Sequence, residues 1–306
     1  MAGRSSKDFA SASLVALVVK SVTDADPGLL PPGTSAPDPM RAATLSAGEK
    51  RGLLDHIYRQ RGAGPLLSIG RHLRDAASPV LSVLANAARP DILTSKWLRL
   101  ERYGHAVNRT DIRLIDEEAL VCRRYAEKGA PTVAENALIA GFLFGLCDLA
   151  GARGMTLKID DREFDAEALA SVGPFEGDGG TFRIEWAKWE PPVSPQTPPG
   201  SAVTGERLKT LLAADVARDW SLAEAAGLMA KSARSLQREL SAEGITFSTA
   251  LRGVRVDEAA RLLRADAASL AEIGYCCGYA DQPHFQRDFR RALNMSPGDY
   301  RRVALA

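Results

Sequence analysis

Arginine and glutamine side chains recur on one face of two predicted helices in the last third of the chain. In the first helix, residues 232–244, this face carries Arg234, Gln237, Arg238 and Ser241. In the second, residues 281–294, it carries Gln282, His284, Arg287 and Arg291. An arginine guanidinium can donate two parallel hydrogen bonds to guanine, and a glutamine amide can pair in the same way with adenine in the major groove. These residue types therefore suit contact with base edges of double-stranded DNA.

A charged, solvated surface would explain either helix on its own. The same polar face, however, repeats at matching positions of two matching units, and this repetition favours recognition over simple solvation.

A repeated tetrapeptide predicts where the helices that carry these polar faces are positioned. The sequence SLAE occurs at 221–224 and again at 269–272, and each copy has the form of a capping box that starts a helix. Small residues follow four apart, Ala226 with Ala230 and Gly274 with Gly278, which permits close helix approach and a tight turn. A second capping residue comes next, Ser232 or Asp281. Two short helices joined by a tight turn, twice over, predict a tandem helix-turn-helix with units at about 221–243 and 269–293.

Apolar spacing predicts what each second helix buries. Leu236 and Leu240 face inward in the first unit, and Phe285, Phe289 and Leu293 do so in the second. Pro283 is tolerated because it lies in the first helical turn. Between the units, residues 254–266 place Val256, Ala259, Ala260 and Leu263 on one buried stripe. Such a helix, ~20 Å long, could hold the units near the roughly 34 Å that separates successive major-groove segments.

Composition bounds the protein class. The chain has 306 residues, enough for two domains, and a formal net charge of +1, so any nucleic-acid binding depends on where the arginines point. Four cysteines without a C-x-x-C pair favour buried thiols in a reduced, cytoplasmic protein. The longest N-terminal apolar run, residues 14–19, is too short to span a membrane, so no membrane association is expected.

Proline-rich stretches divide the chain. Residues 1–45 are expected to be a flexible arm with one short helix from 9 to 22, because residues 24–40 are rich in proline and glycine. Residues 46–190 are expected to form a mainly helical α+β domain, with strands at 155–160 and 181–189 and helical segments that include 116–129 and 133–151. Five prolines mark a linker at 191–204, and an all-α domain follows at 205–306.

The C-terminal stretch resembles the DNA-binding domain of the AraC/XylS family of bacterial transcription regulators. The resemblance rests on SLAEAAGLMAKSARSLQREL, on VDEAARLL and above all on LAEIGYCCGYADQPHFQRDFRRALNMSPGDYR at 270–301. Gly274 and Asn294 depart from the family's usual alanine and glycine, although asparagine also accepts a left-handed helix end. The resemblance implies base contacts from Arg234, Gln237, Arg238, Gln282, His284 and Arg287, and phosphate contacts from Ser232, Arg290, Arg291 and Arg301.

The N-terminal half resembles, more loosely, the effector and dimerisation domain of the ornithine-utilisation-regulator branch of that family. Helical segments such as PTVAENALIAGFLFGLCDLAG and the two late strands suggest it. The resemblance implies a small-molecule effector site or a homodimer. Candidate pocket residues are Trp97, Arg99, Arg102, Tyr103 and His105, although an aromatic and arginine stripe is more often core and solvated surface. Histidines at 56, 72 and 105 are too scattered to predict a metal site, and no cofactor is expected.

The sequence thus predicts a transcription regulator that binds promoter or operator DNA, contacts RNA polymerase if it is an activator, and is not an enzyme. An alternative is an N-terminal enzyme or ligand-binding module with a DNA-binding tail, but G-x-G-x-x-G, G-x-S-x-G and H-E-x-x-H are all absent. A protein-binding module that kept the fold is a further alternative. It would predict acidic or apolar residues at 234, 238 and 287, where the chain has arginines.

Overall fold

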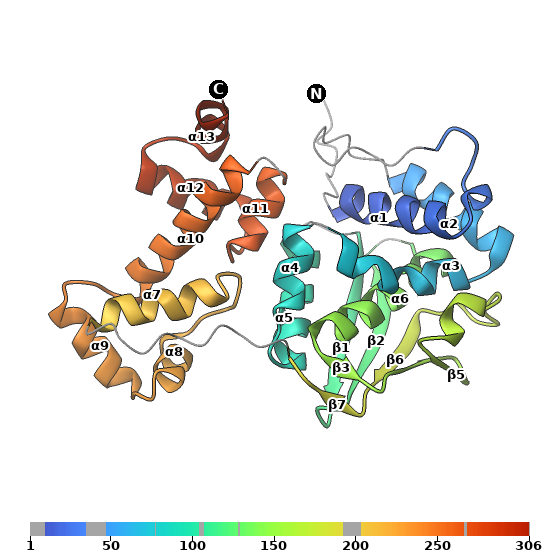
Figure 1. The fold of residues 1–306 in the computed structure, drawn as a ribbon, viewed down its shortest axis with the longest axis horizontal. Helices are drawn as coiled ribbons and strands as arrows, with labels where there is room; N and C mark the ends of the chain where they lie inside the picture. Colours follow the sequence, from blue (N-terminus) through green and yellow to red (C-terminus); the bar gives the residue numbers. More distant parts are fainter. Residues whose placement is uncertain are drawn as a thin grey trace. The chain divides into compact units, whose positions relative to one another are not determined.

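The chain forms two compact units, Met1–Pro192 and Val193–Ala306. The structure is a computed structural model, and it describes residues 10–34, 47–76, 78–103, 107–127, 129–191, 203–265 and 268–305. The first unit is α+β and the second is all helical, as Figure 1 shows. The expected fold classes of the two halves are therefore confirmed.

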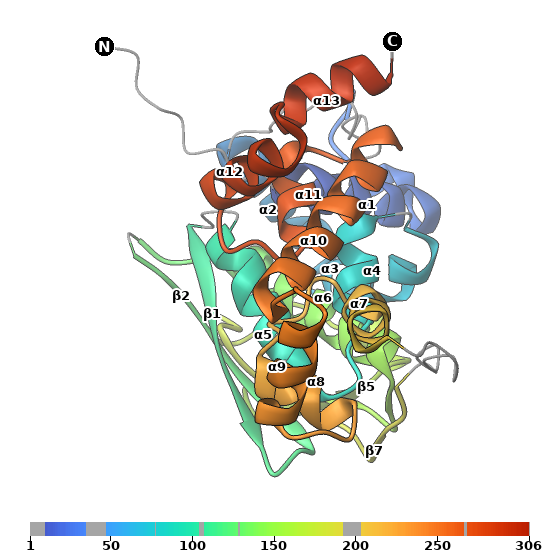
Figure 2. The same ribbon diagram turned by 90° about the vertical axis from the view of Figure 1, so that its left-hand side faces the viewer.

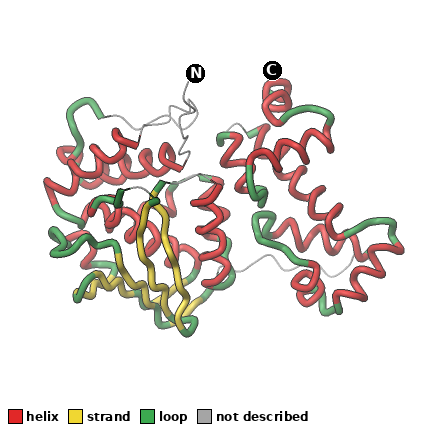
Figure 3. The backbone as a smooth tube through the Cα atoms, turned by 180° about the vertical axis from the view of Figure 1, so that it is seen from behind, coloured by secondary structure: helices red, strands yellow, loops and turns green. Residues whose placement is uncertain are grey.

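The first unit contains a five-stranded antiparallel sheet in the order β1-β2-β6-β4-β5. The strands are β1 (Asn108–Ile115), β2 (Ala119–Ala126), β4 (Thr156–Ile159), β5 (Arg162–Asp165) and β6 (Thr181–Glu185). β1 and β2, eight residues each, form the longest hairpin, which Figure 2 shows along one side of the sheet. α6 lies in front of the strands in Figure 1, whereas Figure 3 shows them uncovered, so helices cover one face and the other is open.

The strand β2 corrects the sequence prediction for residues 116–129, which expected a helix. Leu120, Cys122 and Arg124 are buried, whereas Arg123 and Tyr125 between and after them are exposed, a period of two. Asp116 and Glu117 take left-handed backbone conformations, with φ of 49° and 61°, and turn the chain back from β1 into β2. Pairing with two neighbouring strands overrides the local helical spacing.

Helices precede and cover the sheet. They are α1 (Ala10–Ala25), α2 (Ala47–Arg61), α3 (Gly64–Leu67), α4 (Pro79–Ala85), α5 (Pro90–Tyr103) and α6 (Val133–Ala150), with 3-10 turns η1 (Pro27–Leu29), η2 (Ser68–Asp75) and η3 (Ala168–Ser171).

The helix α1 confirms the short helix expected at residues 9–22, but its burial differs from what a flexible arm would show. Val15, Val18 and Val22 are each at most 2% exposed, so this helix is part of the core of the first unit. Apolar residues at i, i+3 and i+7 give the helix one buried stripe. Burial of this stripe stabilises the helix, although the residues that follow it are rich in proline. The rest of the expected arm, residues 1–9 and 35–45, lies outside the described residues.

The helix α6 is the central core helix of the first unit. Thr132 and Glu135 form a capping box at its start. Added Cβ atoms at Gly141 and Gly145 would lie 2.3 Å and 2.2 Å from backbone atoms of Leu67 and Gly70, so only glycine permits this close approach. α6 is long and apolar enough to cross a membrane, but 78% of it is buried inside the unit, as expected for a core helix.

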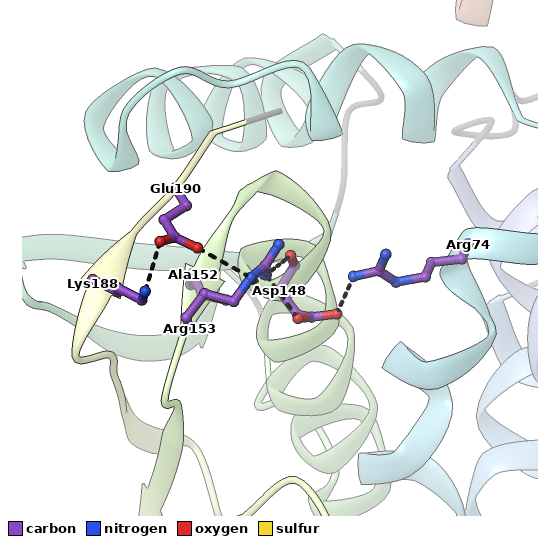
Figure 4. A network of polar contacts seen from close by, with 6 residues as sticks. All are labelled: Arg74, Asp148, Ala152, Arg153, Lys188 and Glu190. Atoms are coloured by element: carbon purple, nitrogen blue, oxygen red, sulfur yellow. Dashed lines mark hydrogen bonds and ion pairs between the residues drawn. The ribbon is translucent and has the colours of Figure 1, made fainter. Parts of the chain in front are cut away.

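A polar network fixes the end of the first unit. The short strands β3 (Ala152–Arg153) and β7 (Lys188–Trp189) pair with each other, and Glu190 donates its backbone N–H to Gly151. Asp148 of α6 pairs with Arg74 at 2.8 Å and with Arg153 at 3.1 Å. Figure 4 shows these contacts together with the Lys188–Glu190 pair, 2.7 Å. The last described residues of the unit are thereby held against its body.

The elements of the second unit, among its described residues 203–265 and 268–305, are all helices. They are α7 (Thr204–Ala214), α8 (Leu222–Leu228), α9 (Ala233–Ala242), α10 (Phe247–Arg264), α11 (Leu270–Cys276), α12 (Gln282–Leu293) and α13 (Pro297–Ala304). α7, α8 and α9 pack at one end of α10, and α11, α12 and α13 pack at the other (Figure 1). All four cysteines of the chain, in both units, are buried.

Candidate nucleic-acid interface

The first helix-turn-helix consists of α8 and α9. Ser221 caps α8 by accepting the backbone N–H of Glu224 at 3.1 Å, and Ser232 caps α9 by accepting that of Ser235 at 3.0 Å. Ala230 in the intervening turn has a φ of 55°, a left-handed conformation that is strained for alanine. The two caps fix where each helix begins, and therefore which side chains of α9 reach the surface.

The capping box expected at the first SLAE copy is only half formed. The Ser221 hydroxyl accepts as predicted, but the structure has no reciprocal bond from the Ser221 backbone N–H to the Glu224 side chain. Glu224 instead accepts from Arg218 Nε at 2.9 Å. Because Arg218 offers a charged donor, it competes successfully with a neutral backbone N–H for this carboxylate.

The helix α9 presents opposite faces to the core and to solvent. Leu236 and Leu240 are at most 1% exposed and pack in a cluster with Leu208, Leu212 and Trp220. The predicted base-contacting residues, Arg234, Gln237 and Arg238, are all exposed. The structure thus brings these three side chains onto one accessible face.

The second helix-turn-helix, α11 and α12, repeats this design with a complete capping box. Ser269 and Glu272 exchange both bonds, at 3.2 Å and 2.7 Å. Gly278, with a φ of 78°, takes the left-handed position in the turn. Asp281 caps α12 by accepting the N–H of His284 at 2.7 Å, and Asn294 ends it in a left-handed conformation, as expected from its residue type.

An aromatic core orients α12. Phe285 and Phe289 are fully buried, and their ring centroids lie 5.8 Å apart, with Tyr279 and Tyr300 packed against them. Leu293, predicted to face inward, is instead 36% exposed, because the helix ends at this residue and the core no longer covers it.

The predicted base-contacting residues of α12 are not equally free. Arg287 is exposed and Gln282 is partly exposed at the helix N-terminus. The ring of His284 packs edge-on against Tyr279, with centroids 5.3 Å apart, and its Nε2 lies 3.4 Å from Asp288. Its side chain remains 40% exposed, so it can still contact a base, but Tyr279 and Asp288 restrict its orientation.

The predicted phosphate-contacting residues divide in the same way. Arg290 and Arg291 are exposed on α12, and Ser232 is exposed at the start of α9. Arg301 on α13, in contrast, is partly buried, and its guanidinium donates to the carbonyl of Ala268 just before α11. This contact ties α13 to the start of the second helix-turn-helix.

The helix α10 connects the two recognition helices. Its 18 residues span ~27 Å at the usual helical rise. The predicted stripe of Val256, Ala259, Ala260 and Leu263 is buried throughout. Arg252 of α10 lies 3.4 Å from Asp288 of α12, an ion pair that fixes the orientation of the second recognition helix on the connecting helix.

Sequence reasoning missed a polar cluster that attaches α9 to the start of α7. Glu239 accepts from the Thr204 hydroxyl at 2.6 Å and from Lys231 at 2.5 Å. These hydrogen bonds, with that from Lys231 the strongest, lower the pKa of Glu239 to about 2. Glu243 accepts the backbone N–H groups of Thr204 and Gly205, both at 2.8 Å. Because Glu243 binds the first turn of α7 from a position 38 to 39 residues away in the chain, no local sequence pattern predicts this contact.

The predicted effector-pocket residues do not gather at one cavity. Trp97 and Tyr103 are buried, Arg99 is partly buried and Arg102 is exposed, while His105 lies outside the described residues. Trp97 is the only one of the four described residues that lines the cavity beside α5. The helical period explains this result, because Trp97 lies on the opposite side of α5 from positions 99, 102 and 103.

Comparisons with known proteins agree with the architecture of the second unit. The family described as helix-turn-helix domain matches residues 222–303. The chain is 33% identical over 100 residues to the transcriptional regulator SirC of Salmonella typhimurium, covering 33% of this chain and 34% of SirC. It is 42% identical over 71 residues to the HTH-type transcriptional activator RhaS of Escherichia coli, covering 23% and 26% of the two chains.

A solved structure of a DNA-binding transcriptional dual regulator from Escherichia coli K-12 has a TM-score of 0.33 and 25% identity, covering 34% of this chain and 94% of that chain. The chain spans about a third of the length of the curated relatives that it matches first.

Two like units, each with a capped second helix and a polar outer face, define the second unit as a tandem helix-turn-helix domain. The matched family and the similar regulators agree with the resemblance of its sequence to the AraC/XylS type.

Proposed function

We propose that the protein is a sequence-specific, DNA-binding transcription regulator that contacts two successive major-groove segments with α9 and α12. One observation carries this proposal. Both recognition helices bury their apolar face in the core and expose a glutamine–arginine pair at corresponding positions, Gln237–Arg238 in α9 and Gln286–Arg287 in α12. Similarity to proteins named transcriptional regulator and transcriptional activator supports the proposal.

The mechanism follows from the hydrogen-bonding capacity of the exposed side chains. Arg234, Arg238 and Arg287 can each form a bidentate pair with guanine, and Gln237 and Gln282 can do so with adenine. Arg290 and Arg291 suit phosphate oxygens, which fix the position of the domain along the duplex without selecting a sequence. Because the chain carries a net charge of only +1, local arginine placement must supply the attraction.

Two recognition helices on one rigid connection favour binding to both sites at once. The ~27 Å length of α10 is comparable with one turn of B-DNA, roughly 34 Å. A second contact made from an already bound domain is effectively intramolecular, so two weak sites give one stable complex.

The first unit is proposed to modulate this activity by binding a small-molecule effector or by forming a homodimer. Contact with RNA polymerase is proposed if the protein acts as an activator. The proposed location is the cytoplasm, where a reduced environment suits four buried cysteines. The alternative, an enzymatic first unit with a DNA-binding tail, has less support. No group of three or more His, Cys, Asp or Glu side chains suited to a metal is found among the described residues.

Selection of bound sequences from random DNA tests the proposal, first with the fragment 203–306 and then with the full chain. We expect one asymmetric motif of two boxes about one helical turn apart from the fragment. Duplication of that motif by the full chain would support a dimerising first unit. Enrichment of no sequence by either protein, with both folded by circular dichroism, would contradict sequence-specific binding and favour a protein-binding role.

A further inference from the structure

A buried ion pair lies between α5 and the β1–β2 hairpin. Arg124 of β2 donates from its NH1 group to Glu101 Oε1 at 3.2 Å and to the Thr110 hydroxyl at 2.6 Å. Glu101 also accepts the Thr110 hydroxyl at 2.8 Å and the Thr110 backbone N–H at 2.9 Å. The side chains of Arg124 and Glu101 are only 3% and 9% exposed. Burial raises the pKa of Glu101, although Arg124 opposes this effect.

Arg124 uses only part of its hydrogen-bonding capacity. Among the described residues, its side-chain hydrogen bonds all come from NH1, and the buried Nε has no partner. Nε and NH2 form the side of a guanidinium that binds a carboxylate with two parallel bonds. An unpaired N–H group on a buried cation is unfavourable, and the bonds to Glu101 and Thr110 leave the Arg124 guanidinium capacity for a further acceptor.

Arg124 lines a cavity of about 110 Å³ that can receive such an acceptor. Its walls are largely apolar, with Leu54 of α2, Trp97 and Leu100 of α5, and Leu138 and Ile139 of α6.

The charged lining favours an anion over a cation. Lys50, Arg51 and Arg124 contribute three positive charges, against two negative charges from Glu101 and Glu135. Both carboxylates are already engaged, Glu101 as described and Glu135 by the Thr132 backbone N–H at 2.9 Å and Arg51 at 3.3 Å. An anionic ligand would therefore balance the net charge of the lining.

We propose that this cavity binds a small monocarboxylate with an apolar body, whose carboxylate pairs with the guanidinium of Arg124. The apolar body lies against Leu54, Trp97 and Ile139, and the size of the cavity restricts it to a short chain. The effector role of this carboxylate rests on the proposed function: if the second unit regulates transcription, this carboxylate is its effector. Binding itself does not depend on that role.

Calorimetric titration of the full-length protein with hexanoate tests the proposal, with hexylamine and hexanol as comparators of similar length. Arg124→Lys keeps the positive charge but removes the two-pronged donor, and Arg123→Lys makes the same change on the exposed face of the same strand. Ile139→Trp fills the cavity without altering any charged group. The fluorescence anisotropy of a DNA fragment, measured on the same preparations, reports the second unit separately.

We expect saturable binding of hexanoate but not of hexylamine or hexanol. Arg124→Lys should weaken it at least ~10-fold, as expected for lost hydrogen bonds between charged groups. Ile139→Trp should abolish binding, and Arg123→Lys should leave it unchanged. If Arg124→Lys does not fold, Ile139→Trp still decides the location of the site.

Three results would overturn the proposal. They are equal binding of hexanol, unchanged binding in Ile139→Trp, and no binding of butyrate, hexanoate or octanoate tighter than about 1 mM by folded protein. Loss of DNA binding with retained carboxylate binding would instead contradict the proposed function alone.

Discussion

The carboxylate of Glu239 on the recognition helix α9 accepts a hydrogen bond from Thr204, the first residue of α7, at 2.6 Å, across 35 positions of sequence. Lys231, in the turn before α9, binds the same carboxylate at 2.5 Å. One ionised side chain therefore joins the recognition helix, its turn and the first helix of the unit.

This cluster predicts a pH dependence of stability. The pKa of Glu239 falls from its ordinary 4.5 to about 2 in the folded protein. A depressed carboxyl pKa stabilises the fold above the ordinary value, and that contribution is lost as the pH falls toward 2. In urea unfolding of the fragment 203–306, the difference between wild type and Glu239→Gln should therefore shrink between pH 4.5 and pH 2. Trp220, the one tryptophan in that fragment, reports the transition. A difference that stays constant over this range would show that the lost hydrogen bonds do not depend on ionisation.

Specificity should depend on single arginines. Arg238→Ala or Arg287→Ala should weaken binding to the selected sequence by about 1 to 3 kcal/mol and relax the preference at one base step. Arg291→Ala, in contrast, should weaken all sequences alike and reduce the salt dependence by about one unit of slope. Anisotropy titrations with the selected site and with single-base variants, at several salt concentrations, distinguish the two patterns. Uniform weakening by Arg238→Ala would reassign that residue to a phosphate contact.

The two turns should respond in opposite ways to exchange of alanine and glycine. Ala230 holds a left-handed conformation, so Ala230→Gly should stabilise the second unit by ~1 kcal/mol through relief of strain. Gly278→Ala should destabilise it by more than ~1 kcal/mol, because the added Cβ is both strained and 2.6 Å from the carbonyl oxygen of Val216. Urea midpoints of the two variants provide the comparison. Destabilisation by Ala230→Gly would indicate that the Ala230 methyl group contributes more through packing than it loses through strain.

The aromatic core of the second helix-turn-helix should tolerate truncation at the helix end but not in its middle. Phe289→Ala should cost ~3 to 5 kcal/mol, because the ring is fully buried between Phe285 and Tyr300. Leu293→Ala, four residues later on the same side of the helix, should cost less than ~1 kcal/mol because the side chain is partly exposed. Equal losses of unfolding free energy would mean that Leu293 is covered in solution.

The second unit was predictable from sequence because its signals are local. Caps such as Ser232 and Asp281, the left-handed Asn294 and the buried Leu236 all depend on residues within a few positions of one another. The half-formed box at Ser221 shows the limit of such signals. Glu224 and Glu272 occupy the same motif position, but only the first has Arg218 within reach.

The first unit was less predictable because its contacts are distant in sequence. The strand β2 was mistaken for a helix, since pairing with β1 and β6 decides its conformation. The Glu101–Arg124 pair joins residues 23 positions apart, and Glu135 contacts Arg51 across 84 positions. The predicted pocket residues were taken from one short stretch of sequence, so they could not reveal a cavity lined by two strands and four helices.

The hydrogen bonds at Glu190 and at Thr204 also have a mechanical consequence. Gly151 and Lys188 contact Glu190 near the end of the first unit. Glu239 and Glu243 contact Thr204 at the start of α7 in the second unit. Each unit therefore fixes its own end of the chain with contacts made inside that unit, so neither set of contacts needs the other unit in order to form.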